Sequence, residues 1–575
     1  MQDFLGHERL VHGPWPAFER ALARLIEHAG FRDIAIVGGP GDLGADIVGT
    51  LDAQRWVIQA KFKRSGGVDS DGIEEAVRAS NSYDAQVCVA ATNQRFTENA
   101  HRRTRAFRSS GIDARLWDRK YLLKYAQRLP VDSIARPTLR PYQSRAVDSI
   151  YAARSSEVPS ALYVMATGLG KTLVAAEIIR LHLDRDRDSE VLVLAHTVDL
   201  VRQLEQAMWR FLDKGTPTHL WTDGESPSFA GGVTFATWQS IAARLRIEGL
   251  HGRYPLIVVD EAHHAPSRKY RRLLEALEPE FMLGATATPW RMDRRLMSDL
   301  GGSEGFEHQH LRPLKREEPL MSDLFGDPIF SMDIVEGMQD GYLADVDYRM
   351  MVDDIDWDEV YRLSQQGYSI RDLNARLIMP ERDEAVVSRL ISAMRSIEEP
   401  RVLCFCRTIS HAEHFTRMLL AFGIGARVLH SGLSRTERFR TLSGFRVGDF
   451  PVLMAVDVLN EGIDLPAVNL VAFMRVTHSR RIFVQQLGRG LRLAPGKQSV
   501  TILDFVADIR RIAAGLVLNR QAALRGRETE VLRFGNGRIV QFEGEIPSEF
   551  ASEFLSDVLA IDDADDSARL VFPEL

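Results

Sequence analysis

One octapeptide limits the possible folds of this chain more than any other stretch: residues 165–172 read Met-Ala-Thr-Gly-Leu-Gly-Lys-Thr. The apolar run 161–164 before it is typical of a buried strand, and residues 173–179 after it have the apolar spacing of a helix. Glycines at such a junction let backbone N–H groups approach an anion, and the dipole of the following helix favours negative charge there. A glycine loop that only makes a turn needs neither the lysine nor the helix. The combination therefore predicts a phosphate site.

The polar residues of this loop have separate expected tasks. Lys171 reaches the β- and γ-phosphates of a nucleotide, and the Thr172 hydroxyl ligates Mg²⁺. The strict pattern of such loops has glycine where Met165 stands, which argues against a generic nucleotide kinase. The other residues of the loop that are expected to contact ATP are Thr167, Gly168 and Gly170.

A second motif supplies the other half of the predicted nucleotide site. Residues 256–259 are four apolar residues typical of a central strand, and Asp260 and Glu261 follow them directly. Ligands of parallel α/β sheets bind at the carboxyl edge of the strands. Asp260 is therefore expected to hold Mg²⁺, and Glu261 to orient and deprotonate the attacking water. An acidic pair at a strand end is usually only a solvated turn, but its partnership with a phosphate loop favours the catalytic interpretation.

These two motifs resemble those of superfamily 2 helicases and translocases of the DEAH type, and the resemblance covers roughly residues 137–508. The helicase form of the loop is Ala-Thr-Gly-x-Gly-Lys-Thr, which residues 166–172 match. The resemblance implies that Gln143 reads adenine. It also implies that Arg489 and Arg492 are arginine fingers, which stabilise the charge developing on the γ-phosphate. The other motifs that match the family, in chain order, are 139–143, 284–289, 456–464 and 485–492.

The same resemblance places contacts with the nucleic-acid backbone after the apolar run 191–195. His196, Thr197 and Gln203 are the candidates. His263 is expected to link the ATP site to the motif at 284–289. Zinc binding by His263 and its neighbour would require a second pair of ligands nearby in the sequence, and none is present.

The first 130 residues carry a separate chemistry. Residues 47–51 and 56–63 are predicted strands, and side chains alternate along the second, so Gln59, Lys61 and Lys63 share one face. A hairpin would bring Asp46 beside Gln59 and Lys61. Asp46 and the Gln59 oxygen would then hold Mg²⁺ for phosphodiester cleavage, while Lys61 positions or activates a water.

This first segment resembles the Mrr-like restriction endonucleases of the PD-(D/E)xK superfamily. The matching motifs are Gly-Asp-x-Gly-x-Asp at 41–46 and Gln-x-Lys at 59–61, followed by a strand and turn at 87–93. Glu19, on a predicted amphipathic helix, matches a carboxylate often present in the family. A basic stretch farther along is expected to follow DNA phosphates. Its residues are Arg102, Arg103, Arg105, Arg108, Arg115, Arg119, Lys120 and Lys124.

Charge, cysteines and hydropathy exclude other classes. The 575 residues carry a net charge of −7, so any nucleic-acid surface has to be local. The three cysteines, Cys88, Cys404 and Cys406, make no disulfide framework, and the last two are expected to be core thiols. The sequence contains no run of about 18 apolar residues, so no membrane-spanning helix is expected. The N-terminus has no basic start and apolar core like those of a signal peptide, so a cytoplasmic protein is expected.

The motifs predict an α/β protein: a restriction-endonuclease-like α/β domain followed by two RecA-like parallel-sheet domains. A connecting segment with weaker strand signals separates the RecA-like domains and contains a small helical insertion at 354–394. The last predicted segment is an extension with an acidic tail. Such a run is usually a solvated end; the alternatives are that it shields a basic DNA groove or binds a partner. The five segments, in chain order, are 1–130, 131–298, 299–395, 396–510 and 511–575.

Together these motifs predict an ATP-dependent DNA helicase or translocase coupled to a metal-dependent DNA endonuclease, with ATP and Mg²⁺ as cofactors. The restriction-like domain implies double-stranded DNA as substrate and a role in restriction or phage defence, with partner proteins of such a system. The alternative is an ATP-driven DNA-binding sensor whose nuclease-like domain only binds DNA, while a partner cuts. Intact Asp46, Gln59 and Lys61 favour the nuclease, and the restriction-like domain disfavours an RNA helicase.

Overall fold

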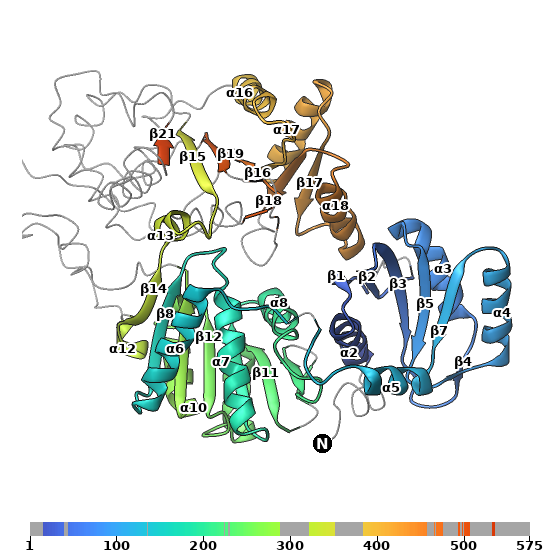
Figure 1. Ribbon diagram of the computed structural model, residues 1–575, viewed down its shortest axis with the longest axis horizontal. Helices are drawn as coiled ribbons and strands as arrows, with labels where there is room; N and C mark the ends of the chain where they lie inside the picture. The colour runs from blue at the N-terminus through green and yellow to red at the C-terminus, as the bar shows by residue number, and fades with distance from the viewer. Residues whose placement is uncertain are drawn as a thin grey trace, which may run out of the picture.

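Three sheets, each with its own helices, make up the part of the chain that the computed structural model describes (Figure 1). The N-terminal sheet has five strands of mixed direction, and the other two have seven parallel strands each. The predicted fold class is thereby confirmed. The described residues are 15–38, 44–134, 136–222, 225–227, 230–287, 321–350, 383–406, 408–456, 465, 467–474, 493–494, 497, 499–505 and 532–534.

The N-terminal sheet has the strand order β1-β2-β3-β5-β7. Its first three strands are antiparallel neighbours, whereas β3, β5 and β7 run parallel to one another. The strands are β1 (Arg32–Ile36), β2 (Ile47–Leu51), β3 (Gln54–Lys61), β5 (Val87–Thr92) and β7 (Asp113–Trp117). The helices are α2 (Trp15–His28), α3 (Asp71–Tyr83), α4 (Glu98–Ser109) and α5 (Arg119–Arg128), and a two-stranded ribbon is formed by β4 (Gly67–Val68) and β6 (Arg95–Phe96).

Alternation along β3 decides which helix each of its side chains meets. Trp56, Ile58 and Ala60 belong to the buried cluster that contains the apolar face of α2. Val57 belongs instead to the cluster that contains the apolar face of α3. Because side chains alternate across a strand, Gln59 and Lys61 lie on the α3 side of the sheet.

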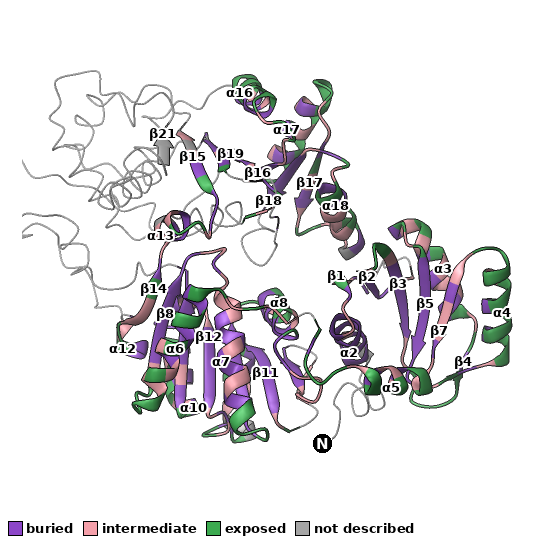
Figure 2. Ribbon diagram, viewed as in Figure 1, coloured by how far each residue is buried: buried purple, intermediate pink, exposed green. Residues whose placement is uncertain are grey.

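The second sheet has the order β10-β11-β9-β12-β13-β8-β14, and every neighbouring pair is parallel. Its central strands are buried along almost their whole length (Figure 2), as their apolar sequences predict. Its strands are β8 (Ser160–Met165), β9 (Glu190–Ala195), β10 (Thr218–Trp221), β11 (Gly232–Thr237), β12 (Leu256–Asp260), β13 (Phe281–Thr286) and β14 (Pro328–Met332). Its helices are α6 (Pro141–Ser155), α7 (Lys171–Arg185), α8 (Val198–Met208), α9 (Trp238–Glu248), α10 (Arg268–Leu277), α12 (Ser322–Phe325) and α13 (Ile334–Gln339).

The third sheet is likewise parallel, in the order β17-β18-β16-β19-β20-β15-β21. Cys404 and Cys406 are buried in β16, where burial raises the pKa of Cys406 to about 12, so the predicted core thiols are confirmed. The strands are β15 (Asp345–Met350), β16 (Val402–Cys406), β17 (Ala426–His430), β18 (Val452–Val456), β19 (Leu470–Met474), β20 (Ser499–Asp504) and β21 (Leu532–Phe534). The helices are α16 (Asp383–Arg395), α17 (Ile409–Ala421) and α18 (Arg435–Val447).

The segment 299–395 contributes more to the two sheets than its weak strand signals predict. Strand β14 pairs with β8 in the second sheet, and β15 pairs with β20 and β21 in the third. Most of the predicted insertion at 354–394 lies outside the described residues; its last part belongs to helix α16. None of the helices in the described part of the chain is long and apolar enough to span a membrane.

Candidate active sites

The predicted phosphate loop joins the end of β8 to the start of α7. Gly168 and Gly170 have φ values of +94° and +85°, in the left-handed region where glycine is favoured. Gln143 Nε2 donates a hydrogen bond to the carbonyl of Leu169 at 2.8 Å, and a Cβ atom at Gly170 would lie only 2.5 Å from that nitrogen. Both the backbone conformation and the space therefore require glycine at position 170. The remaining predicted contact of the loop, Thr167, lies in the turn between the strand and Gly168.

The strand order brings the two halves of the predicted nucleotide site together. Strands β8 and β12 flank β13, so the loop after β8 and the acidic pair after β12 meet at one edge of the sheet. Lys171 Nζ lies 4.0 Å from Glu261 Oε1. Asp260 is the last residue of β12, and Thr172 lies in the first turn of α7. Arg489 and Arg492 lie outside the described residues.

Glu261 is held from two sides. Its Oε2 atom lies 3.3 Å from Nδ1 of His263, and the same nitrogen lies 3.1 Å from the Thr286 hydroxyl, so the predicted link between the ATP site and the motif at 284–289 is present. Burial alone would raise the pKa of Glu261, but the charge of Lys171 and the contact with His263 hold it well below its usual range. The carboxyl group is therefore ionised at neutral pH.

The backbone of Glu261 is also unusual, because its φ of 48° places a residue with a side chain in the left-handed region. It forms the N-cap of a short 3₁₀ helix, η1 (Ala262–His264), that follows β12 directly. Such conformations are unfavourable and gather at functional sites, where the surrounding structure holds them. The sharp turn keeps the Glu261 carboxylate at the sheet edge beside Lys171 instead of letting the strand continue.

The residues predicted to touch nucleic acid begin at the end of β9. Thr197 is the N-cap of α8, and its hydroxyl accepts a hydrogen bond from the backbone N–H of Leu200. The ring of His196 packs on that of His264, with ring centroids 4.5 Å apart. Gln203 lies farther along α8 and is half-buried. Nucleic-acid contact by these residues stays a prediction.

In the N-terminal unit, the predicted hairpin brings Asp46 beside Gln59. Strands β2 and β3 are antiparallel, and Asp46 Oδ2 accepts a hydrogen bond from the backbone N–H of Ala60 at 2.7 Å. Asp46 also converges with Glu19 of α2. A Cβ atom on Gly38 would lie 2.8 Å from Asp46 Oδ1 and 3.2 Å from Glu19 Oε2, so glycine leaves a space between two buried carboxylates.

The Gln59 side chain suits a cation at this place. It is only 4% exposed, and its Oε1 oxygen accepts no hydrogen bond from any described residue. The carboxylates of Asp46 and Glu19 converge near Gly38, and the amide oxygen of Gln59 comes from the strand next to Asp46; all three are hard oxygen donors of the kind that Mg²⁺ prefers. In the part of the chain that is described, no three His, Cys, Asp or Glu side chains form a metal cluster, so the amide is needed to complete this donor set.

Lys61 has a partner that the sequence does not predict. Its Nζ lies 2.5 Å from Oε2 of Glu75 on helix α3. A Cβ atom on Gly72 would lie 3.1 Å from Lys61 Cγ, so the glycine makes room for the lysine stem to pass the helix. The spacing of Gly72 and Glu75 on one helical face was the available signal, but nothing in the sequence tells which strand that face covers.

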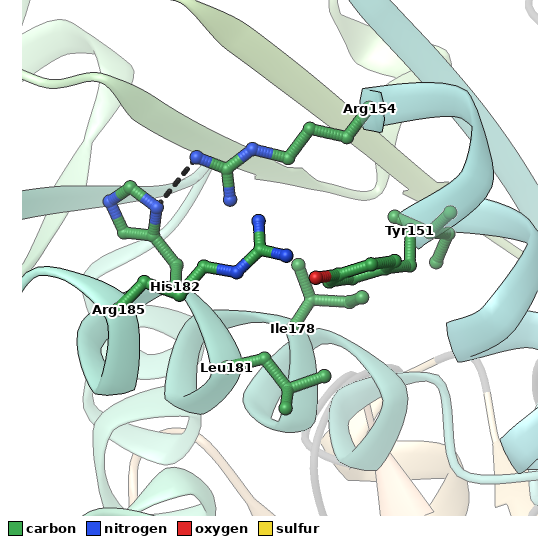
Figure 3. Close-up of a pocket in the computed structure, with 7 residues that line it drawn as sticks. Tyr151, Arg154, Ile178, Leu181, His182 and Arg185 are labelled. Atoms are coloured by element: carbon green, nitrogen blue, oxygen red, sulfur yellow. Dashed lines mark hydrogen bonds between the residues drawn. The ribbon is translucent and has the colours of Figure 1, made fainter. Parts of the chain in front are cut away.

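Apart from both sites, a hollow lies between α6 and α7 of the second sheet (Figure 3). Arg154 donates a hydrogen bond to Nδ1 of His182 at 2.7 Å, so the imidazole proton resides on Nε2, which lies 2.8 Å from the Ser189 hydroxyl. The guanidinium of Arg185 covers the Tyr151 ring, 4.5 Å from its centroid. Burial and the neighbouring Arg154 charge lower the pKa of His182 to about 4.

This shift predicts a pH dependence of stability. Because the pKa of His182 in the folded state is below its ordinary value, the unfolded chain binds more protons than the folded chain between about pH 6.5 and 4. The free energy of unfolding should therefore fall by up to about 3 kcal/mol as the pH decreases through that window. Denaturant unfolding at several pH values should show a shallower decline for His182→Gln than for the wild type. Parallel curves for the two proteins would contradict the prediction.

Three segments of the chain match known protein families. Residues 12–126 match a family described as restriction endonuclease. Residues 136–291 match the type III restriction enzyme res subunit family, and residues 381–494 match the helicase conserved C-terminal domain family. The chain thus joins an N-terminal Mrr-like restriction endonuclease domain to a superfamily 2 helicase core, as the resemblances implied.

Individual relatives match about two thirds of the chain. The DNA 3'-5' translocase XPB2 of Sulfurisphaera tokodaii is 24% identical over 65% of this chain and 85% of its own length. The type I restriction enzyme EcoAI endonuclease subunit of Escherichia coli is 26% identical over 68% of this chain and 50% of its own length. The chain also spans 58% and 52% of two yeast proteins named for an ATP-dependent helicase, irc3 of Schizosaccharomyces pombe and IRC3 of Saccharomyces cerevisiae.

Among solved structures, the type ISP restriction-modification enzyme LlaBIII bound to DNA has a similar fold. It aligns with a TM-score of 0.52 and 16% sequence identity, over 94% of this chain and 42% of that one. At this identity the likeness concerns the fold alone.

Proposed function

We propose that this protein is an ATP-dependent DNA helicase or translocase of the DEAH type, coupled to a metal-dependent DNA endonuclease. The observation that carries the proposal is that one chain holds two separate sets of converging polar side chains. Lys171 and Glu261 meet at the edge of a parallel sheet, and Asp46 meets Glu19 in a mixed sheet, with Gln59 on the strand next to Asp46. The relatives named for translocase and restriction activities support the same combination.

At the ATP site, Glu261 is the proposed base. Its carboxyl group is ionised and fixed by His263, so it can accept a proton from the attacking water. Thr172 and Asp260 would hold Mg²⁺, which neutralises charge on the phosphates. Lys171 binds the phosphates, with Thr167, Gly168 and Gly170 of the loop. Gln143, which packs against the loop, is the proposed adenine reader.

We predict that Arg489→Ala and Arg492→Ala each slow ATP hydrolysis by about two orders of magnitude or more, as arginine fingers do. Nucleotide affinity should change less, because the charge that these residues stabilise develops in the transition state. Steady-state hydrolysis and titration with a fluorescent nucleotide measure the two quantities. An unchanged kcat in both variants would place the second half of the ATP site elsewhere.

At the nuclease site, Asp46 and Gln59 would hold Mg²⁺, with Glu19 as a third oxygen donor. Such an ion offsets the negative charge that builds up on a phosphodiester during cleavage. Lys61, on the same face of β3 as Gln59, would position the water or the phosphate. The fit rests on buried oxygens that converge next to Gly38 and on a Gln59 oxygen that no described residue uses.

Double-stranded DNA is the proposed substrate, and restriction or phage defence the proposed role. Helix α4 lies on the outside of the N-terminal unit (Figure 2) and is exposed over most of its length. Arg102 and Arg105 of this helix are exposed, whereas Arg115 is paired with Asp113 and lies over the Trp56 ring. Exposed arginines and lysines supply the sequence-independent part of DNA binding. The segment boundaries at 130, 298, 395 and 510 are part of the same proposal.

A DNA-binding sensor without nuclease activity is the second candidate. The observation in its favour is that Lys61 Nζ is bound to Glu75 instead of to Asp46. Incubation of the protein with plasmid DNA and Mg²⁺, with and without ATP, decides between the two. The nuclease interpretation is supported if the wild type produces linear or nicked DNA and Lys61→Ala does not. Uncut DNA under every metal, ATP and DNA condition supports the sensor.

A further inference from the structure

The nuclease-like unit docks firmly on the unit of the second sheet, the first helicase lobe. Arg20 of α2 lies 3.1 Å from Glu205 of α8 and 2.6 Å from Glu225, and these three side chains are 11%, 2% and 15% exposed. Arg24, one turn farther along α2, donates hydrogen bonds of 2.8 Å to the carbonyls of Thr216 and Asp213. Figure 1 shows α2 between the two sheets.

Apolar and polar contacts from α8 extend this interface. Trp209 belongs to the buried core cluster of the nuclease-like unit, although it follows α8 of the helicase lobe. Gln206 donates a hydrogen bond to the carbonyl of Ile34, and Arg210 pairs with Glu27 at 2.7 Å. Separating a buried ion pair costs much free energy, because each charge would be left in the protein without its partner. We therefore expect the nuclease-like unit and the first helicase lobe to move together as one rigid body.

The contact with the third sheet, the second helicase lobe, is much smaller. At the C-terminal end of α3, the Tyr83 hydroxyl donates to Thr436 Oγ1 of α18 at 3.0 Å, and its ring meets Phe439 edge-on with centroids 5.6 Å apart. Arg440 donates to the carbonyl of Ser82 at 3.0 Å. Because these contacts between α3 and α18 are few, they can change when the two helicase lobes move relative to each other.

The other end of the same helix holds the nuclease site. Glu75, in the first turns of α3, binds Lys61 Nζ at 2.5 Å. Glu75 and Tyr83 are eight residues apart, so about 12 Å of continuous helix joins the two contacts. A helix of this length moves as a rigid rod. A displacement at Tyr83 therefore reaches Glu75 and, through it, the amine of Lys61.

We propose that helix α3 couples the second helicase lobe to the nuclease site, with Glu75 as the positioning residue for Lys61. The inference rests on the proposed nuclease function and adds its regulation by ATP. ATP binding draws the two lobes together, the α2 interface keeps the nuclease-like unit on the first lobe, and the contact between α3 and α18 changes. The shift of α3 moves Glu75 and sets Lys61 for cleavage, so ATP raises the cutting rate.

Two variants of the full-length protein test the contact from its two sides. Tyr83→Phe and Thr436→Val each remove one hydrogen bond and keep the shape of the side chain. In both variants ATP should no longer stimulate plasmid cleavage, so that the rates with and without ATP differ by less than about twofold. DNA-stimulated ATP hydrolysis should stay as in the wild type. The matched control is Tyr121→Phe, an exposed tyrosine of α5, which should keep the full response to ATP. A wild-type response in both interface variants would overturn the coupling.

The Glu75 arm separates positioning from structural support. Glu75→Gln should lower kcat for cleavage about tenfold, because Lys61 loses its charged partner. The KM for DNA should not rise, since the change removes a negative charge near the phosphates. Glu75→Asp, which keeps the charge, should recover part of the rate. A raised KM with unchanged kcat, or an Asp variant no better than the Gln variant, would overturn the assignment.

A third measurement keeps the coupling testable apart from the nuclease. Hydrogen exchange of residues 71–83 should change when a non-hydrolysable ATP analogue binds, and Tyr83→Phe should remove that change. If the wild type never cuts DNA but this change is seen, the nuclease function fails and the coupling stands. If the hydrogen-exchange rates of α3 in the wild type are the same with and without the ATP analogue, the proposed coupling is wrong, whatever the cleavage assay shows.

Discussion

ATP turnover by the Glu261→Gln protein is expected to fall by about three orders of magnitude, while ATP is still bound. Glu261 sits 4.0 Å from Lys171 and is also held by His263, and this environment keeps its carboxyl group ionised. The amide of glutamine has nearly the same shape but cannot accept the proton of the attacking water. The proposed metal ligand Asp260 is untouched. Steady-state hydrolysis with and without DNA, together with nucleotide titration, measures both effects.

A matched control for this change is available on a helix of the same lobe. Glu275 of α10 is 54% exposed and pairs with Arg271 four residues earlier. Glu275→Gln makes the same chemical replacement in a surface ion pair, which contributes little to stability. It should leave turnover unchanged. Wild-type hydrolysis by Glu261→Gln would show that another residue activates the water.

The sequence predicts the helicase core well because its strands are buried on both faces. The runs at 161–164, 191–195 and 256–259 are continuous apolar stretches, and each lies in an inner strand of the second sheet. The functional residues follow these strands at their carboxyl ends. Since parallel strands present those ends at one edge, a correct strand assignment is enough to predict that Lys171 and Glu261 meet.

The strands in the segment 299–395 escaped prediction for the opposite reason. Strand β15 reads Asp-Val-Asp-Tyr-Arg-Met, and its charged residues Asp345, Asp347 and Arg349 alternate with apolar ones. Two of these charges neutralise each other, because Arg349 pairs with Asp347 at 2.5 Å. The neighbouring strands β20 and β21 lie more than a hundred residues farther along the chain. A strand whose pairing depends on such distant partners has no local signal.

Glu75 illustrates the same limit at the nuclease site. Asp46, Gln59 and Lys61 lie on one hairpin, so the alternation of β3 is enough to predict their proximity. Glu75 comes from a helix, and its contact with Lys61 depends on how α3 packs across the sheet. Only the tertiary structure fixes that packing. The sequence therefore showed the residues of the hairpin and missed the carboxylate that faces them.

The burial of Asp46 decides how the nuclease should be inactivated. Asp46 is 1% exposed and accepts the Ala60 N–H, so Asp46→Ala would leave that donor unsatisfied in the core, at a penalty of about 1–3 kcal/mol. Asp46→Asn keeps an oxygen for the bond and removes only the charge. The better test therefore compares Asp46→Asn with Asp52→Asn, a control at an exposed turn of the same hairpin.

Asp46→Asn is expected to lower DNA cleavage by at least about a hundredfold and to leave DNA-stimulated ATP hydrolysis intact. A phosphodiester is an anion that repels hydroxide, and its transition state carries still more negative charge. A neutral amide in place of the Asp46 carboxylate weakens the binding of the divalent ion that offsets this charge. Lys171→Ala should instead abolish hydrolysis and, if the motor delivers DNA to the nuclease, cleavage as well. Supercoiled-plasmid cleavage and phosphate release, measured on the same preparations, separate the two sites. Cleavage by Asp46→Asn at the rate of Asp52→Asn would mean that the proposed nuclease site does not cut DNA.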